Sequence, residues 1–186
     1  INIRGTQHAA EVAKRLGASL AHISTISVSG TRYADDAGRK GVFTESNYDI
    51  CQNYADNEYV RSKFLAEGIV LDEMRGGLNA RIFRVGVLTS TLDGRFQIRT
   101  EKNAFANRVK ALCAIGSVPM GMLGKRLEMT PVDACAEAIV SLSRLRRPIK
   151  PVYHAYNTNM LTLAELVGYL EAAGERIEVV SDAEFG

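Results

Sequence analysis

The chain has 186 residues, and its 23 basic and 21 acidic side chains leave a formal net charge of +2. Hydrophobic residues make up 46% and charged residues 24%, which is typical of a globular protein of one to two domains. These values exclude a disordered tail, a collagen-like fibre and a disulfide-stapled miniprotein. So small a net charge gives no electrostatic reason to expect nucleic acid or a membrane surface as partner. No apolar run is long enough to cross a bilayer.

The cysteines and histidines indicate neither a disulfide framework nor a metal site. Cys51, Cys113 and Cys135 are odd in number and far apart, which favours reduced thiols in a cytoplasmic protein. The three histidines are scattered, and no cluster of histidine, cysteine and carboxylate residues has the spacing of metal ligands. The sequence therefore predicts no metal site.

Helices and short apolar strands alternate in the first half of the chain. Apolar residues recur at helical spacing over residues 3–16 and 59–75, and each stretch ends at a glycine. Residues 19–28 and 79–88 are short apolar stretches without alternation, typical of strands buried on both faces of a parallel sheet. The polar segment 30–56 reads as a long loop, and loops of that length are usually functional.

The middle of the chain continues with a polar loop over residues 89–103 and a helix from about 105 to 116. A further helix opens at residues 130–133. Two caps are open there: Thr130 with a proline at the first helical position, or Asp133 with a later start.

The last third of the chain predicts a strand over residues 151–157, a helix opened by the capping box Thr162–Glu165 and a short strand over residues 177–180. The order of elements, αβαβααβαβ, predicts an α/β fold with a mostly parallel sheet. Ligands bind such sheets beyond the carboxyl ends of the strands.

Three side chains at or near one of those ends are suited to proton transfer. Tyr59 and Lys63 lie four residues apart, so a helix places them on one face. An ammonium beside a phenol favours the phenolate, which suits a tyrosine that donates a proton to a developing alkoxide. Thr25, in the expected strand 19–28, could hold the same oxygen. Two simpler readings stay open: a solvated helix face for the pair, and an ordinary strand or capping residue for Thr25.

Several segments together resemble the extended short-chain dehydrogenase/reductases, which use serine or threonine, tyrosine and lysine as a catalytic triad. The matching segments are residues 2–6 (NIRGT), 24–28 (STISV), 59–67 (YVRSKFLAE) and 81–88 (RIFRVGVL). Val85 stands where that family usually has a proline, close to the expected nicotinamide site.

Within that superfamily the chain most resembles the thioester reductase domains of nonribosomal peptide synthetases and carboxylic acid reductases. This resemblance also includes residues 129–133 (MTPVD) and 152–159 (VYHAYNTN). The strand, G-x-x-G-x-x-G motif and helix that open such domains do not occur in the sequence, and the first residue falls almost directly in a helix. The resemblance therefore implies the C-terminal portion of a longer enzyme.

The resemblance implies a Rossmann-like parallel sheet with helices on both faces, without its first nucleotide-binding strands, and a small α/β substrate-binding subdomain. Residues 1–90 are then the second half of the NAD(P)-binding domain and hold the triad. Residues 91–186 are mainly the substrate-binding subdomain, with a strand near 152–157 that returns to the main sheet.

By the same resemblance the catalytic residues are Thr25, Tyr59 and Lys63, and Asn2 supports Lys63 through water. The cofactor is expected to be NADPH, with NADH left open. The residues expected to bind it are Ser24, Tyr59, Lys63, Arg84, Val85, Gly86 and Val87, the last four through their main chain.

The implied reaction is NAD(P)H-dependent release of an acyl group as an aldehyde, and a second reduction to the alcohol stays open. The acyl group would be a thioester on a phosphopantetheinylated carrier protein, and the upstream part of the same polypeptide would complete the enzyme. Three alternatives stay open: a fatty acyl-CoA reductase, an enzyme for a nucleotide sugar (an epimerase or dehydratase) or a sterol, and a non-catalytic NAD(P)-binding sensor.

Overall fold

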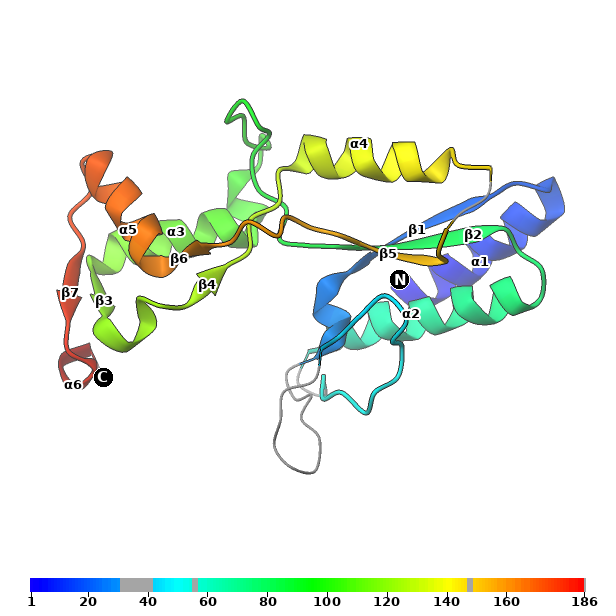
Figure 1. The fold of residues 1–186 in the computed structure, drawn as a ribbon, viewed down its shortest axis with the longest axis horizontal. Coiled ribbons are helices and arrows are strands. Elements are labelled where there is room, and N and C mark those ends of the chain that lie inside the picture. The colour runs from blue at the N-terminus through cyan, green and yellow to red at the C-terminus, as the bar shows by residue number, and fades with distance from the viewer. Residues whose placement is uncertain (31–41, 55–56, 147–148, 186) are drawn as a thin grey trace. The chain divides into compact units, whose positions relative to one another are not determined.

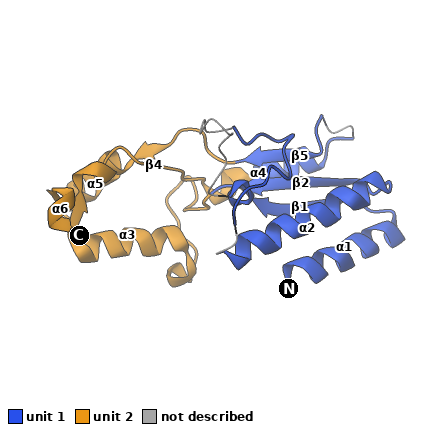
Figure 2. Cartoon of the chain, turned by 90° about the horizontal axis from the view of Figure 1, so that it is seen from below, with its two compact units in different colours: residues 1–86, 136–155 blue, residues 87–135, 156–186 orange. Residues whose placement is uncertain are grey.

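The computed structural model describes residues 1–30, 42–54, 57–146 and 149–185. The chain forms two compact units, shown in separate colours in Figure 2. Unit 1 contains residues 1–86 and 136–155, and unit 2 contains residues 87–135 and 156–186. The chain first passes from unit 1 to unit 2 between residues 86 and 87.

Unit 1 is built on a parallel sheet of three strands in the order β1–β2–β5. The strands are β1 (Leu20–Thr25), β2 (Ala80–Val85) and β5 (Val152–Ala155). The central strand β2 is buried along its whole length, as its unbroken apolar pattern predicts. Thr25 pairs with Val85, and Val85 with Ala155, so the three strands end level with one another.

Helices cover both faces of this sheet (Figure 1). On one face lie α1 (Asn2–Leu16) and α2 (Glu58–Arg75), and on the other lies α4 (Val132–Ser143), which belongs to unit 1 from residue 136 onward. Arg81 of β2 is held against the α4 side, where its guanidinium donates to the carbonyls of Ser143 and Leu145. The α/β architecture is thereby confirmed.

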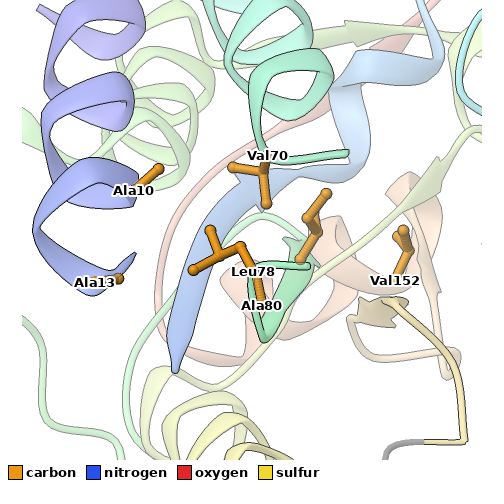
Figure 3. Packing of buried hydrophobic residues seen from close by; sticks show 7 residues of the cluster. Ala10, Ala13, Val70, Leu78, Ala80 and Val152 are labelled. Carbon is orange, nitrogen blue, oxygen red and sulfur yellow. The ribbon is translucent and has the colours of Figure 1, made fainter. Parts of the chain in front are cut away.

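The core of unit 1 lies between the sheet and the two helices α1 and α2. Small residues on α1 let that helix approach closely, and Val70 of α2 packs with them over the sheet (Figure 3). The buried members of this cluster are Ala10, Ala13, Val70, Leu78, Ala80, Ile82 and Val152.

The first strand is shorter than the sequence predicts. It ends at Thr25 rather than near residue 28, and Ile26–Ser29 form a short 3₁₀ helix. The Thr25 hydroxyl accepts a hydrogen bond from the Ser27 N–H at 3.2 Å and so caps this turn. Of the expected loop 30–56, residues 31–41 and 55–56 lie outside the described residues.

Unit 2 contains two small sheets. Strands β3 (Ser117–Pro119) and β7 (Glu178–Val180) pair in parallel, and β4 (Arg126–Leu127) and β6 (Leu161–Thr162) pair antiparallel. Its helices are α3 (Ala104–Ile115), α5 (Leu163–Ala172) and α6 (Asp182–Phe185), with 3₁₀ turns at Thr100–Lys102 and Met120–Met122. The buried apolar cluster of this unit consists of Val118, Leu163, Val167 and Ile177.

Two helix starts in unit 2 test the capping predictions. The box at α5 is confirmed, because Thr162 and Glu165 each accept a hydrogen bond from the other's backbone N–H. Neither cap expected for α4 is formed at residues 130–133. The Thr130 hydroxyl instead donates to Glu128 and accepts from the Asn157 N–H at 2.8 Å, and Asp133 accepts the Leu92 N–H.

The buried position of Ile82 in β2 yields a stability prediction. Ile82→Ala leaves a cavity beneath α2, because the side chain is 0% exposed, and should lower the free energy of unfolding by about 2–5 kcal/mol. Urea unfolding measures this. Ile149→Ala is the control: its side chain is 84% exposed, and we expect a change within about 0.5 kcal/mol. Equal losses in the two variants would contradict the packing described.

Candidate active site

The candidate site lies at the carboxyl end of β1, where α2 runs alongside the strand. Lys63 Nζ donates to the Ile23 carbonyl at 2.9 Å, and one turn further along α2 Glu67 accepts a hydrogen bond from Ser24 Oγ at 2.5 Å. Two successive turns of α2 are thus attached to β1. Thr25 follows Ser24 at the end of the strand, and Tyr59 precedes Lys63 by one helical turn.

Thr25 is 7% exposed, and its hydroxyl caps the 3₁₀ turn after β1. The interpretation of Thr25 as a capping residue is therefore correct for its hydroxyl oxygen, which accepts the Ser27 N–H. A hydroxyl also carries one O–H donor. The geometry is compatible with a second role in which Thr25 donates to another oxygen.

Tyr59 lines a pocket of about 460 Å³ in unit 1. The side chain is 55% exposed, so its hydroxyl is accessible to a bound molecule. The pocket is bounded by the turn after β1, by the segment before α2 and by the first turn of α2. Its lining residues are Ile26, Ser27, Ser29, Gly30, Asn53, Tyr54, Asn57, Tyr59 and Val60.

Asn57 fixes where α2 begins. Its side chain accepts a hydrogen bond from the Val60 N–H at 3.1 Å, so it caps the helix two residues before Tyr59. Because Asn57 also lines the pocket, the cap sets the position of Tyr59 on the pocket wall.

The electrostatics around Lys63 are set by burial. Burial lowers the pKa of Lys63 from its ordinary value, and the nearby Glu67 carboxylate opposes that shift. Burial, reinforced by the Lys63 charge, also lowers the pKa of His22 to about 4. His22 is therefore neutral near pH 7 and adds no positive charge beside the lysine.

Asn2 lies at the start of α1 and contacts α2 directly. Its amide Nδ2 donates to Ser62 Oγ at 2.9 Å, and that hydroxyl donates to the Tyr59 carbonyl at 2.8 Å. The first turns of α1 and α2 are joined by this chain of hydrogen bonds. Asn2 thus acts on the backbone of the helix turn that carries Tyr59.

The sequence interpretation missed a buried ion pair beneath the site. Glu67 and Arg84 are both 0% exposed, and their closest contact joins Arg84 Nη2 to Glu67 Oε2 at 2.7 Å. Arg84 Nε also donates to both carboxylate oxygens, at 3.1 and 3.0 Å. The spacing of Tyr59, Lys63 and Glu67, four residues apart on one helix face, was the available signal.

The remaining N–H donors of Arg84 bond to residues 44–47 and to His154 of β5. Nη1 donates to the Thr44 carbonyl and to His154 Nε2, each at 3.3 Å, and Nη2 donates to the Asn47 carbonyl at 2.9 Å. The guanidinium carbon lies 4.6 Å from the centre of the Phe43 ring. Because a guanidinium only donates, His154 accepts through Nε2 and is neutral. Burial and Arg84 lower the pKa of His154, in agreement.

Two further residues attach the same segment to its surroundings. Gln52 is buried, and its amide nitrogen donates to the carbonyls of Val28 and Tyr48, each at 3.0 Å. The Tyr48 ring stacks on Phe64 of α2 with 4.4 Å between ring centres, and its hydroxyl donates to the Phe64 carbonyl. Burial, together with Glu67, raises the pKa of Tyr48 to about 12, so this phenol stays protonated.

The residues expected to contact a cofactor through the main chain lie at the carboxyl end of β2. The Gly86 N–H donates to the Ala155 carbonyl at 3.3 Å, and the Val87 N–H donates to the Glu128 carboxylate. The side chains of Ser24 and Arg84 point into the interior, toward Glu67. Ser24 is 1% and Arg84 0% exposed, so neither residue is accessible to a ligand in this structure.

Comparison with protein families finds one match over most of the chain. The family model described as "Male sterility protein", an NAD-binding model, matches residues 1–139. Glycine betaine reductase ATRR of Emericella nidulans is 27% identical over 97% of this chain, which spans 14% of that protein.

Solved structures of reductase domains resemble the whole chain. A thiolation-reductase di-domain from an archaeal non-ribosomal peptide synthetase is 31% identical, with a TM-score of 0.87 over 100% of this chain and 50% of that one. The reductase domain of the aureusimine biosynthetic cluster is 30% identical, with a TM-score of 0.85 over 98% of this chain and 48% of that one. The chain thus spans about half the length of these domains.

The close approach of Gly30 to Asn53 at the pocket wall yields a second prediction. Gly30 has φ +69°, and a Cβ added there would lie 2.8 Å from the Asn53 carbonyl oxygen. Gly30→Ala should therefore cost about 1–3 kcal/mol of unfolding free energy. Gly5→Ala is the control, because it adds a Cβ to open space on α1 and should stabilise by about 0.5–1 kcal/mol. If thermal unfolding shows no loss for Gly30→Ala, the close approach is wrong.

The lowered pKa of His22 predicts how stability depends on pH. The unfolded chain takes up a proton near pH 6.5, whereas the folded protein does so only near pH 4, so stability falls as the pH drops through this window. The slope from one such group is up to about 1.4 kcal/mol per pH unit. His22→Asn should reduce the difference in unfolding free energy between about pH 7 and about pH 5. An unchanged difference would show that His22 is not the group responsible.

Proposed function

The chain belongs to the family described as "Male sterility protein", a family of NAD(P)-dependent oxidoreductases, and we propose its reaction from this premise. The protein reduces an acyl thioester with a nicotinamide cofactor. The observation that carries the proposal is the placement of Lys63 against the end of β1. Lys63 donates to the carbonyl of Ile23, two residues before Thr25, and Tyr59 precedes Lys63 by one helical turn. The likeness to reductase domains of peptide synthetases supports the thioester as substrate class.

The donors at this edge fit a nicotinamide cofactor. An ammonium has three N–H donors, and Lys63 uses one of them on the Ile23 carbonyl, which leaves donors suited to ribose hydroxyls. Lys63, Tyr59 and the main chain of residues 85–87 would hold the cofactor, at the sheet edge where α/β folds bind such ligands. We take NADPH as the preferred form, and assays with NADPH and NADH in parallel decide between them.

Each of the three polar side chains has a distinct role in the proposed reaction. When bound, the nicotinamide supplies a hydride to the carbonyl carbon of the thioester. The Tyr59 hydroxyl gives its proton to the carbonyl oxygen, and the Thr25 hydroxyl stabilises the charge developing there with a hydrogen bond. The Lys63 ammonium, one turn along the helix, stabilises the phenolate left on Tyr59.

The product follows from the chemistry of a thioester. Addition of one hydride and one proton gives a hemithioacetal, which loses its thiol as the carbon–sulfur bond breaks and the carbonyl forms again. The released compound is an aldehyde, and the thiol stays on its carrier. We propose that the carrier is the phosphopantetheine arm of a carrier protein, in keeping with the thiolation domain named in one of the similar structures.

Unit 2, taken by itself, contains an apolar hollow. A hollow of about 320 Å³ runs along α3, and its lining is almost wholly apolar. Val109, Leu112 and Ile115 of α3 form one side, and Leu163 and Leu166 of α5 line the hollow as well. An alkyl or aromatic group would bury apolar area in this hollow, whereas a sugar would leave its hydroxyls unpaired there.

Replacement of the proposed acid tests the proposal. In the intact protein, Tyr59→Phe should lower turnover of an acyl-pantetheine thioester by about 100-fold or more, because the proton donor is lost. Cofactor affinity should change by less than about threefold, since one hydroxyl is removed and the ring is kept. NADPH oxidation and cofactor titration measure the two quantities.

The matched control is Tyr169→Phe, which removes a hydroxyl from an exposed tyrosine on α5 and should leave both quantities unchanged. Carrier-bound thioester, the same acyl group on coenzyme A, and a nucleotide sugar are compared as substrates. Turnover of the sugar without turnover of either thioester would refute the proposal. Cofactor binding without turnover of any of the three would favour a sensor.

A further inference from the structure

We propose that Arg84 is a positioning residue for substrate binding: it anchors the segment 43–52, which in turn positions Asn53 and Tyr54 as one wall of the Tyr59 pocket. The inference concerns the same site and rests on the proposed function for its kinetic consequence. Arg84 is 0% exposed and cannot touch a substrate, so it acts through the segment to which its guanidinium is bonded.

Every N–H donor of the Arg84 guanidinium has an acceptor. Its five N–H donors meet the Glu67 carboxylate twice, His154 Nε2 once, and the carbonyls of Thr44 and Asn47 once each. Glu67 balances the charge, and the two carbonyls attach the segment. A fully buried charge is tolerated only when paired and hydrogen-bonded in this way.

The segment that Arg84 anchors leads directly to the pocket. The segment held at Thr44 and Asn47 continues into Tyr48 and Gln52, whose contacts with Phe64 and Val28 fix it against α2 and against the turn after β1. Asn53 and Tyr54 follow directly and line the pocket beside Tyr59. The position of that wall therefore depends on anchors that begin at Arg84.

The anchoring requires an arginine at position 84 rather than a lysine. A lysine at position 84 could still neutralise Glu67, but its single ammonium lacks the planar fork that reaches two carbonyls and a carboxylate at once. Arg84→Lys should therefore keep the charge balance on α2, and with it the chemistry of Tyr59 and Lys63, while it releases the wall. The expected signature is a change in KM rather than in kcat.

The chain offers a matched control on the same strand. Arg81 is also buried in β2 and also donates to two carbonyls, those of Ser143 and Leu145, but on the opposite face of the sheet. Arg81→Lys should perturb the fold to a similar degree without reaching the Tyr59 pocket. A merely structural role for Arg84 would make the two variants alike.

The experiment compares the two variants in the intact protein by hydrogen exchange and by kinetics. Arg84→Lys should speed amide exchange in residues 44–54 by about tenfold or more, while Arg81→Lys should do so only near residues 141–146. With an acyl-pantetheine thioester, Arg84→Lys should raise KM about tenfold and change kcat by less than about twofold. Arg81→Lys should leave both constants within about twofold of the wild type.

The outcomes separate this inference from the proposed function. Equal exchange in residues 44–54 for the two variants overturns it, and so does a fall in kcat at constant KM. If no thioester is turned over by the wild type, the thioester proposal fails, and faster exchange in Arg84→Lys still supports the anchoring of the wall. If Arg84→Lys does not fold, Gln52→Ala replaces it, because this change releases the same segment from Val28. It must then give the same faster exchange and the same rise in KM. Gln97→Ala, at an exposed position, is its control.

Discussion

The buried ion pair between Glu67 and Arg84 is the interaction on which the rest of the site depends. Two charges without solvent contact are costly, and removing one partner of such a pair typically costs about 3–5 kcal/mol because the other charge is left unpaired. The pair joins α2 to β2 and, through Ser24, to β1. The helix that carries Tyr59 and Lys63 thus takes its position relative to the sheet from a contact beneath the surface.

That contact also separates two tasks along one helix. Tyr59 lines the open pocket, Lys63 bonds to the edge of β1, and Glu67 lies in the interior, so exposure falls turn by turn along α2. On this helix the proposed proton donor is exposed, and the carboxylate that anchors the helix to the sheet is buried. A site arranged on a helix and a strand is held more rigidly than one carried by loops alone.

The sequence predicted the elements whose signal is local. The helices over residues 2–16 and 58–75 and the capping box at residue 162 were found within a residue or two, because apolar spacing and capping chemistry are written in neighbouring residues. The end of β1 was missed, because Thr25 caps a turn that its strand-like sequence hides. The Thr130 cap was wrong, because its hydroxyl binds Asn157, 27 residues away.

For the site, spacing and resemblance predicted Tyr59 and Lys63; both lie on α2, and Lys63 bonds to β1. The spacing of Glu67 after Lys63 was visible in the sequence, but its pairing with Arg84 was not, since the two residues lie on different elements and the acceptors Thr44 and Asn47 contribute only backbone carbonyls. Every residue has a backbone carbonyl, so the residue type does not show which carbonyls accept these hydrogen bonds. The same holds for Gln52, whose burial depends on the path of the chain around it.

The central claim, reduction of a thioester at this site, is tested most directly by following the hydride. A single turnover of an acyl thioester with NADPH deuterated at the transferred position should give an aldehyde that carries one deuterium on its carbonyl carbon, detected by mass spectrometry. An alcohol with two deuterons would support the same claim and add a second reduction. Release of the unlabelled acid, or of no product while cofactor binds, would contradict the account.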